Sequence, residues 1–149
     1  FTSFVDTIPV TVSRKMIIEG QKAYNIYCVA CHGFAGDGKG MVGTRWSYPP
    51  ANLTGEVYRD SANRQGKDGY LFEVIREGVW GPDGANKMPG YKHAISEMEA
   101  WSVVAYLRTL QKARGSSWDD LTPEQQAALG KPTPAPATDS AESTEGGDS

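Results

Sequence analysis

The two cysteines of this 149-residue chain, Cys28 and Cys31, lie three positions apart, and His32 follows the second directly. A single pair of this kind cannot supply the disulfide framework that stabilises many small secreted domains. The fold must therefore depend on an apolar core. With 39% hydrophobic residues, the chain is long enough for one compact domain and some unpacked extension.

The sequence Cys28-Val29-Ala30-Cys31-His32 has the pattern of c-type haem attachment, in which two thiols add to porphyrin vinyl groups and the next imidazole binds iron. A thioredoxin-like dithiol would require a βαβ context, whereas a helical pattern precedes this motif and a glycine-rich loop follows it. A zinc site would need the motif together with His93, and the neighbouring Cys31 and His32 are poorly placed to complete one tetrahedron. We therefore expect one covalently bound haem c, with His32 as an axial ligand.

The other axial position of the iron would have to be filled by a methionine or by His93. Met88 lies in Lys87-Met88-Pro89-Gly90, between two predicted helices, where proline fixes the local backbone and the loop can cross the far haem face. The remaining methionines are better explained by packing, by surface exposure or by a position too soon after the motif: Met16, Met98 and Met41. We expect Met88 to be the second ligand, with His93 as its competitor.

Three segments have the apolar periodicity of helices, and they predict an all-α fold. The first covers about 14–28 and contains Gly20, which costs roughly 1 kcal/mol of helix stability relative to alanine and so indicates a close helix crossing. The second covers 69–77, with Asp68 as its cap. The third covers about 96–113. The segments between them, rich in glycine and proline, are predicted to be loops with a functional role.

The third predicted helix begins with a capping-box pattern, formed by Ser96 and Glu99. The whole chain divides into an extended arm (1–13), a helical domain (14–115), a short helical extension (116–130) and an acidic tail (131–149). The tail is rich in Pro, Ser and Thr, and it has no large apolar residue to form a core, so we expect it to be disordered. The arm is unusually apolar for a free terminus, and it could dock on a partner.

Charge and hydropathy exclude two classes of function. The net charge is −3, without the basic face that nucleic-acid backbones require, so no nucleic-acid partner is expected. No stretch approaches the roughly 20 apolar residues that span a bilayer. Any attachment to a membrane is therefore expected to come from partner subunits, from a lipid or from a segment outside this sequence.

Three features occur in the order that is typical of class I c-type cytochromes, and the sequence resembles that family. They are a helix with Gly20 and Tyr24 before CVACH, the pair Met88-Pro89, and a final helix ending in VVAYLRTL. The resemblance implies helices packed around one covalent haem, with Gly20 and Tyr24 against Val103 and Tyr106 at a crossing of the first and last helices.

The same resemblance implies that a backbone carbonyl within 48–50 accepts the Nδ1 hydrogen of His32. It also suggests the remaining haem-pocket residues: Pro49, Pro50 and Tyr91. The two haem propionates require hydrogen-bond donors, and we expect these from Arg45 and Trp46, although arginine at this position is also typical of an exposed surface.

Seven segments in order resemble the mono-haem cytochrome c subunit of alternative complex III, a bacterial quinol:electron-acceptor oxidoreductase. They are PVT, GQKAYNIYCVACHG, GDGKGMV, PPANL, GYLFEVIREG, KMPGY and WSVVAYLRTLQ. The resemblance implies partners, namely a multihaem cytochrome, an iron–sulfur subunit and a downstream oxidase or soluble cytochrome. Two departures are the lengthened loop at 81–86 and the absence of an upstream lipid-attachment cysteine.

A cytochrome of this kind is not an enzyme by itself, and no catalytic base or nucleophile is expected. Because haem is attached to apocytochromes outside the cytoplasm, the resemblance implies a periplasmic or extracytoplasmic location on the inner membrane. A freely diffusing periplasmic electron shuttle is the alternative, and a thiol or metal-binding module is a remote one.

Overall fold

The computed structural model describes residues 3–115, 118–120 and 122–124. It divides into two units, Phe1–Ser116 and Ser117–Ser149, which are treated separately. In the second unit, Trp118–Asp120 forms a 3₁₀ turn, η3. Most of the predicted helical extension (116–130) and all of the acidic tail (131–149) lie outside the described residues.

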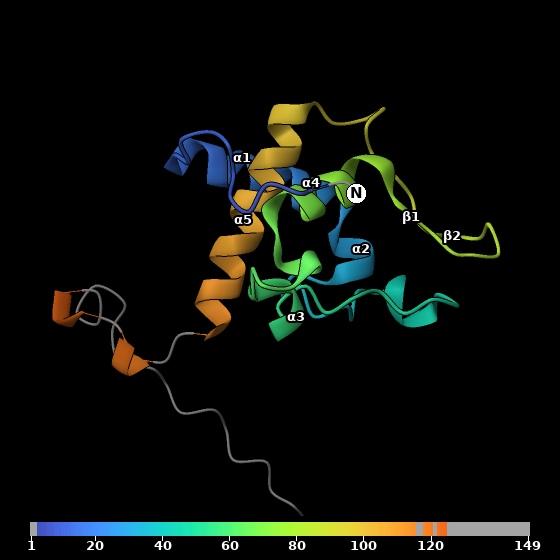
Figure 1. The fold of residues 1–149 in the computed structure, drawn as a ribbon. Helices are drawn as coiled ribbons and strands as arrows, with labels where there is room; N and C mark the ends of the chain where they lie inside the picture. The colour runs from blue at the N-terminus through green and yellow to red at the C-terminus, as the bar shows by residue number, and fades with distance from the viewer. Residues whose placement is uncertain (1–2, 116–117, 121, 125–149) are drawn as a thin grey trace, which may run out of the picture. The chain divides into compact units, whose positions relative to one another are not determined.

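The first unit is organised around the crossing of two helices, α1 (Arg14–Tyr27) and α5 (Glu97–Gly115) (Figure 1). α1 begins where the Met16 amide donates a hydrogen bond to Ser13 Oγ, at 3.2 Å. At the crossing, a Cβ atom on Gly20 would overlap the backbone carbonyl of Ser102. The predicted close approach at Gly20 is therefore confirmed, and it places Tyr24 beside Tyr106, with ring centroids 5.3 Å apart.

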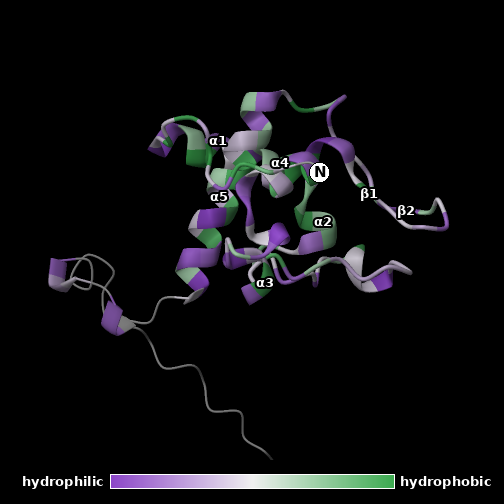
Figure 2. Ribbon diagram, viewed as in Figure 1, coloured by the Kyte–Doolittle hydropathy of each residue, from purple (hydrophilic) through white to green (hydrophobic). Residues whose placement is uncertain are grey.

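The capping box predicted for α5 is also confirmed. The Ser96 amide donates to Glu99 Oε2 at 2.8 Å, and the Glu99 amide donates to Ser96 Oγ at 3.2 Å. α5 carries both hydrophobic and hydrophilic residues along its length (Figure 2), and its buried residues include four in a row, 102–105, so the middle of the helix is buried on more than one face. Most of the buried apolar core comes from this helix and from α1 and α4: Ala23, Tyr24, Cys28, Leu71, Ile75, Ile95, Ala100, Val103, Val104 and Leu107.

Helix α4 (Asp68–Glu77) begins one residue earlier than predicted, and Asp68 is not its cap. The Asp68 carboxylate instead accepts a hydrogen bond from Arg108, at 2.6 Å, so the prediction of a side-chain cap is wrong. The helix ends at Gly78 as predicted, because Gly78 has the left-handed φ of 81° that favours glycine.

The amino-terminal arm supplies the cap that α4 lacks. The Gly69 amide donates to the Val5 carbonyl at 3.0 Å, and Lys67 forms an ion pair with Asp6 at 2.7 Å. Phe4 is 9% exposed and packs edge-on against the Tyr70 ring, with centroids 5.5 Å apart. The apolar arm therefore lies on its own chain.

The glycine-rich segment after α1 contains short helical turns and few other regular elements. These are α2 (Val29–His32), η1 (Gly43–Arg45), α3 (Glu56–Arg59) and η2 (Arg64–Gly66). The segment folds back on itself where the Leu53 amide donates to the Gly36 carbonyl, at 2.7 Å.

The fold is helix-rich, in agreement with the all-α prediction, but the loop after α4 contains a two-stranded sheet that was not predicted. β1 (Val79–Trp80) and β2 (Asn86–Met88) pair antiparallel, with Val79 opposite Met88. Between the strands, the Gly81 amide donates to the Ala85 carbonyl at 2.8 Å, and Gly84 takes a left-handed φ of 76°. The glycine and aspartate of this insertion close a hairpin turn. No helix in the described part of the chain is long and apolar enough to cross a membrane.

Candidate functional site

A cavity of about 390 Å³ lies in the first unit, and separate parts of the chain form its wall. Most of the predicted site residues line this cavity: Cys28, Cys31, His32, Trp46, Pro49, Pro50, Met88 and Tyr91. The structure therefore brings the Cys-x-x-Cys-His motif and the distant Met-Pro loop to one place.

The motif is positioned by a break between two helices. α1 ends at Tyr27, and the amides of Cys31 and His32 both donate to the Cys28 carbonyl, at 3.2 and 2.8 Å. This turn places both sulfurs and the imidazole on the cavity wall. Burial, followed by the neighbouring Cys31, raises the pKa of the Cys28 thiol to about 12. A thiol of this kind is unlike the low-pKa nucleophile of a dithiol oxidoreductase.

His32 is 7% exposed, and its Nδ1 lies 3.1 Å from the Ala51 carbonyl oxygen. Because a carbonyl can only accept, Nδ1 carries the hydrogen, and Nε2 keeps a lone pair for a metal. Burial lowers the pKa of His32, although the hydrogen bond to Ala51 partly offsets this effect. On balance the pKa of His32 is lowered, which favours the neutral imidazole, and the hydrogen bond to Ala51 fixes the tautomer that can bind a metal.

The acceptor for His32 is one residue later than the resemblance implied. The predicted acceptor lay within 48–50, whereas the structure uses Ala51. Two contacts fix this register: the Leu53 amide binds Gly36, and Gly38 packs directly against the Pro50 carbonyl, which leaves no room for a side chain. The Pro50 carbonyl faces Gly38, and the next carbonyl is the one that reaches His32.

Met88 is held in the wall by the hairpin and by α4. Its strand partner is Val79, and the Met88 carbonyl packs directly against Gly78. After the turn at Pro89, the Tyr91 amide donates to the Ile75 carbonyl of α4, at 2.9 Å. The side chain that the sequence selected as the second ligand thus belongs to the same cavity as His32.

The competing ligands do not line the cavity. His93 is exposed on the turn before α5. Met41 and Met98 are 76% and 54% exposed, and Met16 is buried on α1. The geometry therefore favours Met88 over each alternative that the sequence left open.

Arg45 is exposed at the end of η1 and does not line the cavity, unlike its neighbour Trp46. Lys87 and Tyr48 provide polar groups in the wall instead. The Lys87 amine lies 5.0 Å from the Tyr48 ring centroid, and the Tyr48 hydroxyl donates to Asp83 Oδ2 at 3.3 Å. This contact joins the segment before Ala51 to the turn of the hairpin. Hydrogen bonds, chiefly from the Ala85 amide, lower the pKa of Asp83 and keep it charged.

Sequence reasoning missed much of the aromatic and aliphatic wall: Tyr27, Leu53, Tyr58, Tyr70, Leu71, Val74 and Val79. Tyr27 precedes the motif directly, and its ring lies 5.6 Å from that of Tyr91. Nothing in the local sequence marks Tyr58 or Tyr70, because their place in the wall depends on how α3 and α4 pack.

These residues fit a haem c. Its thioether bonds would be made by Cys28 and Cys31, and its iron would be bound by His32 and Met88. The surrounding wall is largely apolar, as a porphyrin requires. When bound, the haem supplies a one-electron couple. Within the described residues, no group of three or more His, Cys, Asp or Glu side chains is arranged to hold a metal ion.

The cavity and its donor set define an electron-transfer cytochrome c domain. Residues 16–107 match the family model described as "Cytochrome C oxidase, cbb3-type, subunit III", and the chain belongs to this family of cytochrome c domains. The match covers both the Cys-x-x-Cys-His motif and Met88.

A search of curated proteins gave no match. Among solved structures, the chain is similar to cytochrome cL from the marine methylotrophic bacterium Methylophaga aminisulfidivorans MPT. The two sequences are 22% identical, the alignment covers 85% of this chain and 76% of the other, and the TM-score is 0.45.

Proposed function

We propose that this chain is a mono-haem c-type cytochrome, with its haem attached through Cys28 and Cys31 and its iron bound by His32 and Met88. One observation carries the proposal: these four side chains, from two distant segments, line a single largely apolar cavity. The chain's own residues would orient the imidazole through Ala51, present a thioether from the hairpin and exclude water. No substrate pocket beyond this cavity is needed, because electrons pass through an exposed edge to a partner.

The ligand assignment is tested by Met88→Ala in the haem-loaded protein. A thioether ligand raises the reduction potential relative to other ligand sets. We expect Met88→Ala to lower the midpoint potential and to remove the far-red thioether-to-ferric-iron absorption band. Redox titration and visible spectroscopy measure both.

Met41→Ala is the matched control, because Met41 is 76% exposed and does not line the cavity. It should leave the potential and the band unchanged. An unchanged absorption band in Met88→Ala would show that Met88 is not the ligand. Loss of the band in Met41→Ala alone would assign the ligand to Met41.

We further propose that the cytochrome works as a subunit of alternative complex III, on the extracytoplasmic face of the inner membrane. There it would relay electrons from a multihaem cytochrome towards a terminal acceptor such as an oxidase. The joint order of the seven segments, from PVT to WSVVAYLRTLQ, supports this assignment. The family match at 16–107 is consistent with a role in a respiratory chain.

A freely diffusing shuttle is the second candidate, and the amino-terminal arm favours it. This apolar arm was one reason to expect a fixed partner. In the structure, Phe4 is instead buried against Tyr70 of the same chain, and the Val5 carbonyl is bound by Gly69. A self-docked arm leaves less apolar surface for a partner subunit.

Purification from native membranes distinguishes the two candidates. Solubilisation with a mild detergent should recover the cytochrome in constant ratio to a multihaem cytochrome and to quinol-oxidising activity. Recovery of the cytochrome alone, in the salt-washed soluble fraction, would refute the complex assignment and establish the shuttle.

A further inference from the structure

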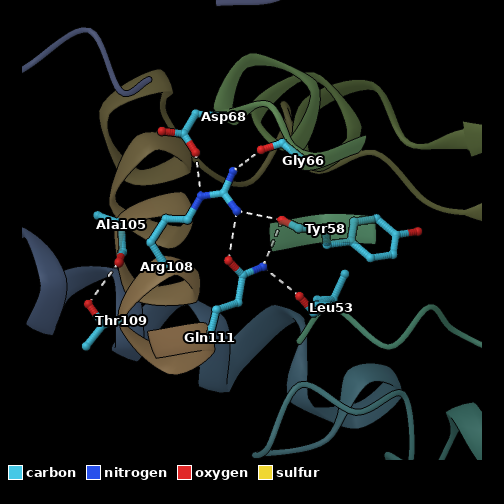
Figure 3. Close-up of polar contacts among 8 residues, drawn as sticks. All are labelled: Leu53, Tyr58, Gly66, Asp68, Ala105, Arg108, Thr109 and Gln111. Atoms are coloured by element: carbon cyan, nitrogen blue, oxygen red, sulfur yellow. Dashed lines mark hydrogen bonds and ion pairs between the residues drawn. The ribbon is translucent and has the colours of Figure 1, made fainter. Parts of the chain in front are cut away.

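Arg108, on α5, binds a segment of the chain that contains only short helical turns before α4 (Figure 3). Its Nε donates to the Asp68 carboxylate at 2.6 Å, and one terminal nitrogen donates to the Tyr58 carbonyl, also at 2.6 Å. The other terminal nitrogen donates to the Gly66 carbonyl. Because Asp68 is 6% exposed and the Arg108 side chain 25%, water and salt screen this ion pair less than an exposed pair.

Gln111 lies one turn further along α5 and binds the same segment. It is 4% exposed, and its amide nitrogen donates to the Leu53 carbonyl at 2.6 Å and to the Tyr58 carbonyl at 3.2 Å. Its oxygen accepts from Arg108 at 2.7 Å, which fixes the orientation of the amide. Arg108 and Gln111 together are called the α5 clamp below.

Two of the three carbonyls bound by the α5 clamp belong to residues of the cavity wall. Leu53 and Tyr58 both line the cavity, and the backbone between them contains only the start of α3, the four-residue helix Glu56–Arg59. Ala51, which accepts the His32 hydrogen bond, lies two residues before Leu53. A helix on the far side of this wall therefore holds the backbone that orients the proximal imidazole.

We propose that Arg108 and Gln111 are positioning residues for the haem site, acting through the backbone of residues 51–58. They hold the Leu53–Tyr58 wall and the Ala51 carbonyl in one register, and so stabilise the orientation of His32. This inference rests on the proposed function, and it names two residues that influence the reduction potential without touching the haem. Hydrogen bonds to a histidine ligand alter its basicity and the potential of the metal that it binds.

The test compares haem-loaded wild type with Gln111→Met and Arg108→Lys. Gln111→Met keeps the volume of the side chain and removes its hydrogen bonds. Arg108→Lys keeps the positive charge beside Asp68 but loses the planar guanidinium, which donates to several acceptors at once. Thr109→Ala is the matched control on the same helix, because the one partner of the Thr109 hydroxyl among the described residues is the Ala105 carbonyl, within α5 itself, at 3.0 Å. Midpoint potential, covalent haem content and backbone amide exchange are measured for each protein.

In Gln111→Met, we expect the Leu53 and Tyr58 amides to exchange about tenfold faster, while the Cys28 amide at the end of α1 stays at its wild-type rate. The midpoint potentials of Gln111→Met and Arg108→Lys should both shift from that of wild type in the same direction. Each shift should be larger than the one caused by the control, Thr109→Ala. A potential equal to that of wild type, or an equal increase in exchange throughout the chain, would overturn the proposal. Wild type without covalent haem would instead refute the proposed function.

Discussion

At Gly20 two helix backbones touch, and the absence of a side chain is what permits the contact. Alanine would improve the intrinsic helix propensity of α1 by about 1 kcal/mol. It would also force α1 away from Ser102 of α5, and overpacking of this kind typically costs about 1–3 kcal/mol or more. We therefore expect Gly20→Ala to lower the free energy of unfolding, as measured by denaturant titration of the haem-loaded protein.

Gly84→Asn provides the comparison for Gly20→Ala. Gly84 has a φ of 76°, which asparagine tolerates, and among the described residues nothing beyond its own two chain neighbours lies within 4 Å of an added Cβ. Its free energy of unfolding should stay within about 0.5 kcal/mol of wild type. A more stable Gly20→Ala protein would show that the helices can separate without loss.

At the same scale, the sequence identified the residues that carry the proposed chemistry, because their spacing encodes it. Two thiols and an imidazole must occupy fixed positions to hold one porphyrin, so Cys28, Cys31 and His32 could be predicted directly. Ala51 could not, because its register depends on the distant pair Gly36 and Leu53. Arg45 was proposed from its neighbours alone, and the chain turns it outward.

The start of α5 makes helix stability depend on pH. Hydrogen bonds from the Ser96 amide, and then from the Ser96 hydroxyl, lower the pKa of Glu99. A carboxyl whose pKa falls on folding adds stability above its unfolded pKa, about 4.3, and loses it as the pH falls through the lower folded value. We expect Ser96→Ala to cost about 1 kcal/mol at neutral pH. Ser96→Ala leaves the bond from the residue 96 amide to Glu99 in place, whereas Glu99→Gln removes the titrating group and should reduce the loss of stability on acidification below about pH 5.

Equilibrium unfolding from pH 7 to pH 3 measures this difference. Glu73→Gln, at an exposed position of α4, should keep the acid dependence of wild type. If Glu99→Gln and wild type lost stability in parallel on acidification, the capping box would not be the source of the effect.

Among the secondary-structure elements, the helices could be predicted and the hairpin could not. Apolar periodicity and capping residues mark α1, α4 and α5 in short windows of sequence. β1 and β2 have only two and three residues, so they leave no periodic signal, and their pairing depends on the turn at 81–85. The same insertion that separates this chain from the family pattern is what positions Met88.

At the scale of the molecule, the parts of the site that escaped prediction are those made by tertiary packing. The Tyr58 and Tyr70 walls, the arm on α4 and the α5 clamp each join segments that are distant in sequence. Asp68 illustrates the difference: its local context predicts a helix cap, yet Arg108 recruits its carboxylate from another helix. Local sequence propensity can determine where a helix forms, while a buried ion pair with another helix determines what one of its side chains binds.

The crossing of α1 with α5 also governs the order in which this protein can form. α1 is synthesised early, but its partner is the last helix of the domain, and the whole haem-binding segment lies between them. A growing chain that has not reached α5 has no partner for the Gly20 face, and contacts that close such long loops form slowly. The native fold therefore becomes available only after the entire domain has been made. Until then the Cys-x-x-Cys-His motif stays accessible on an open chain.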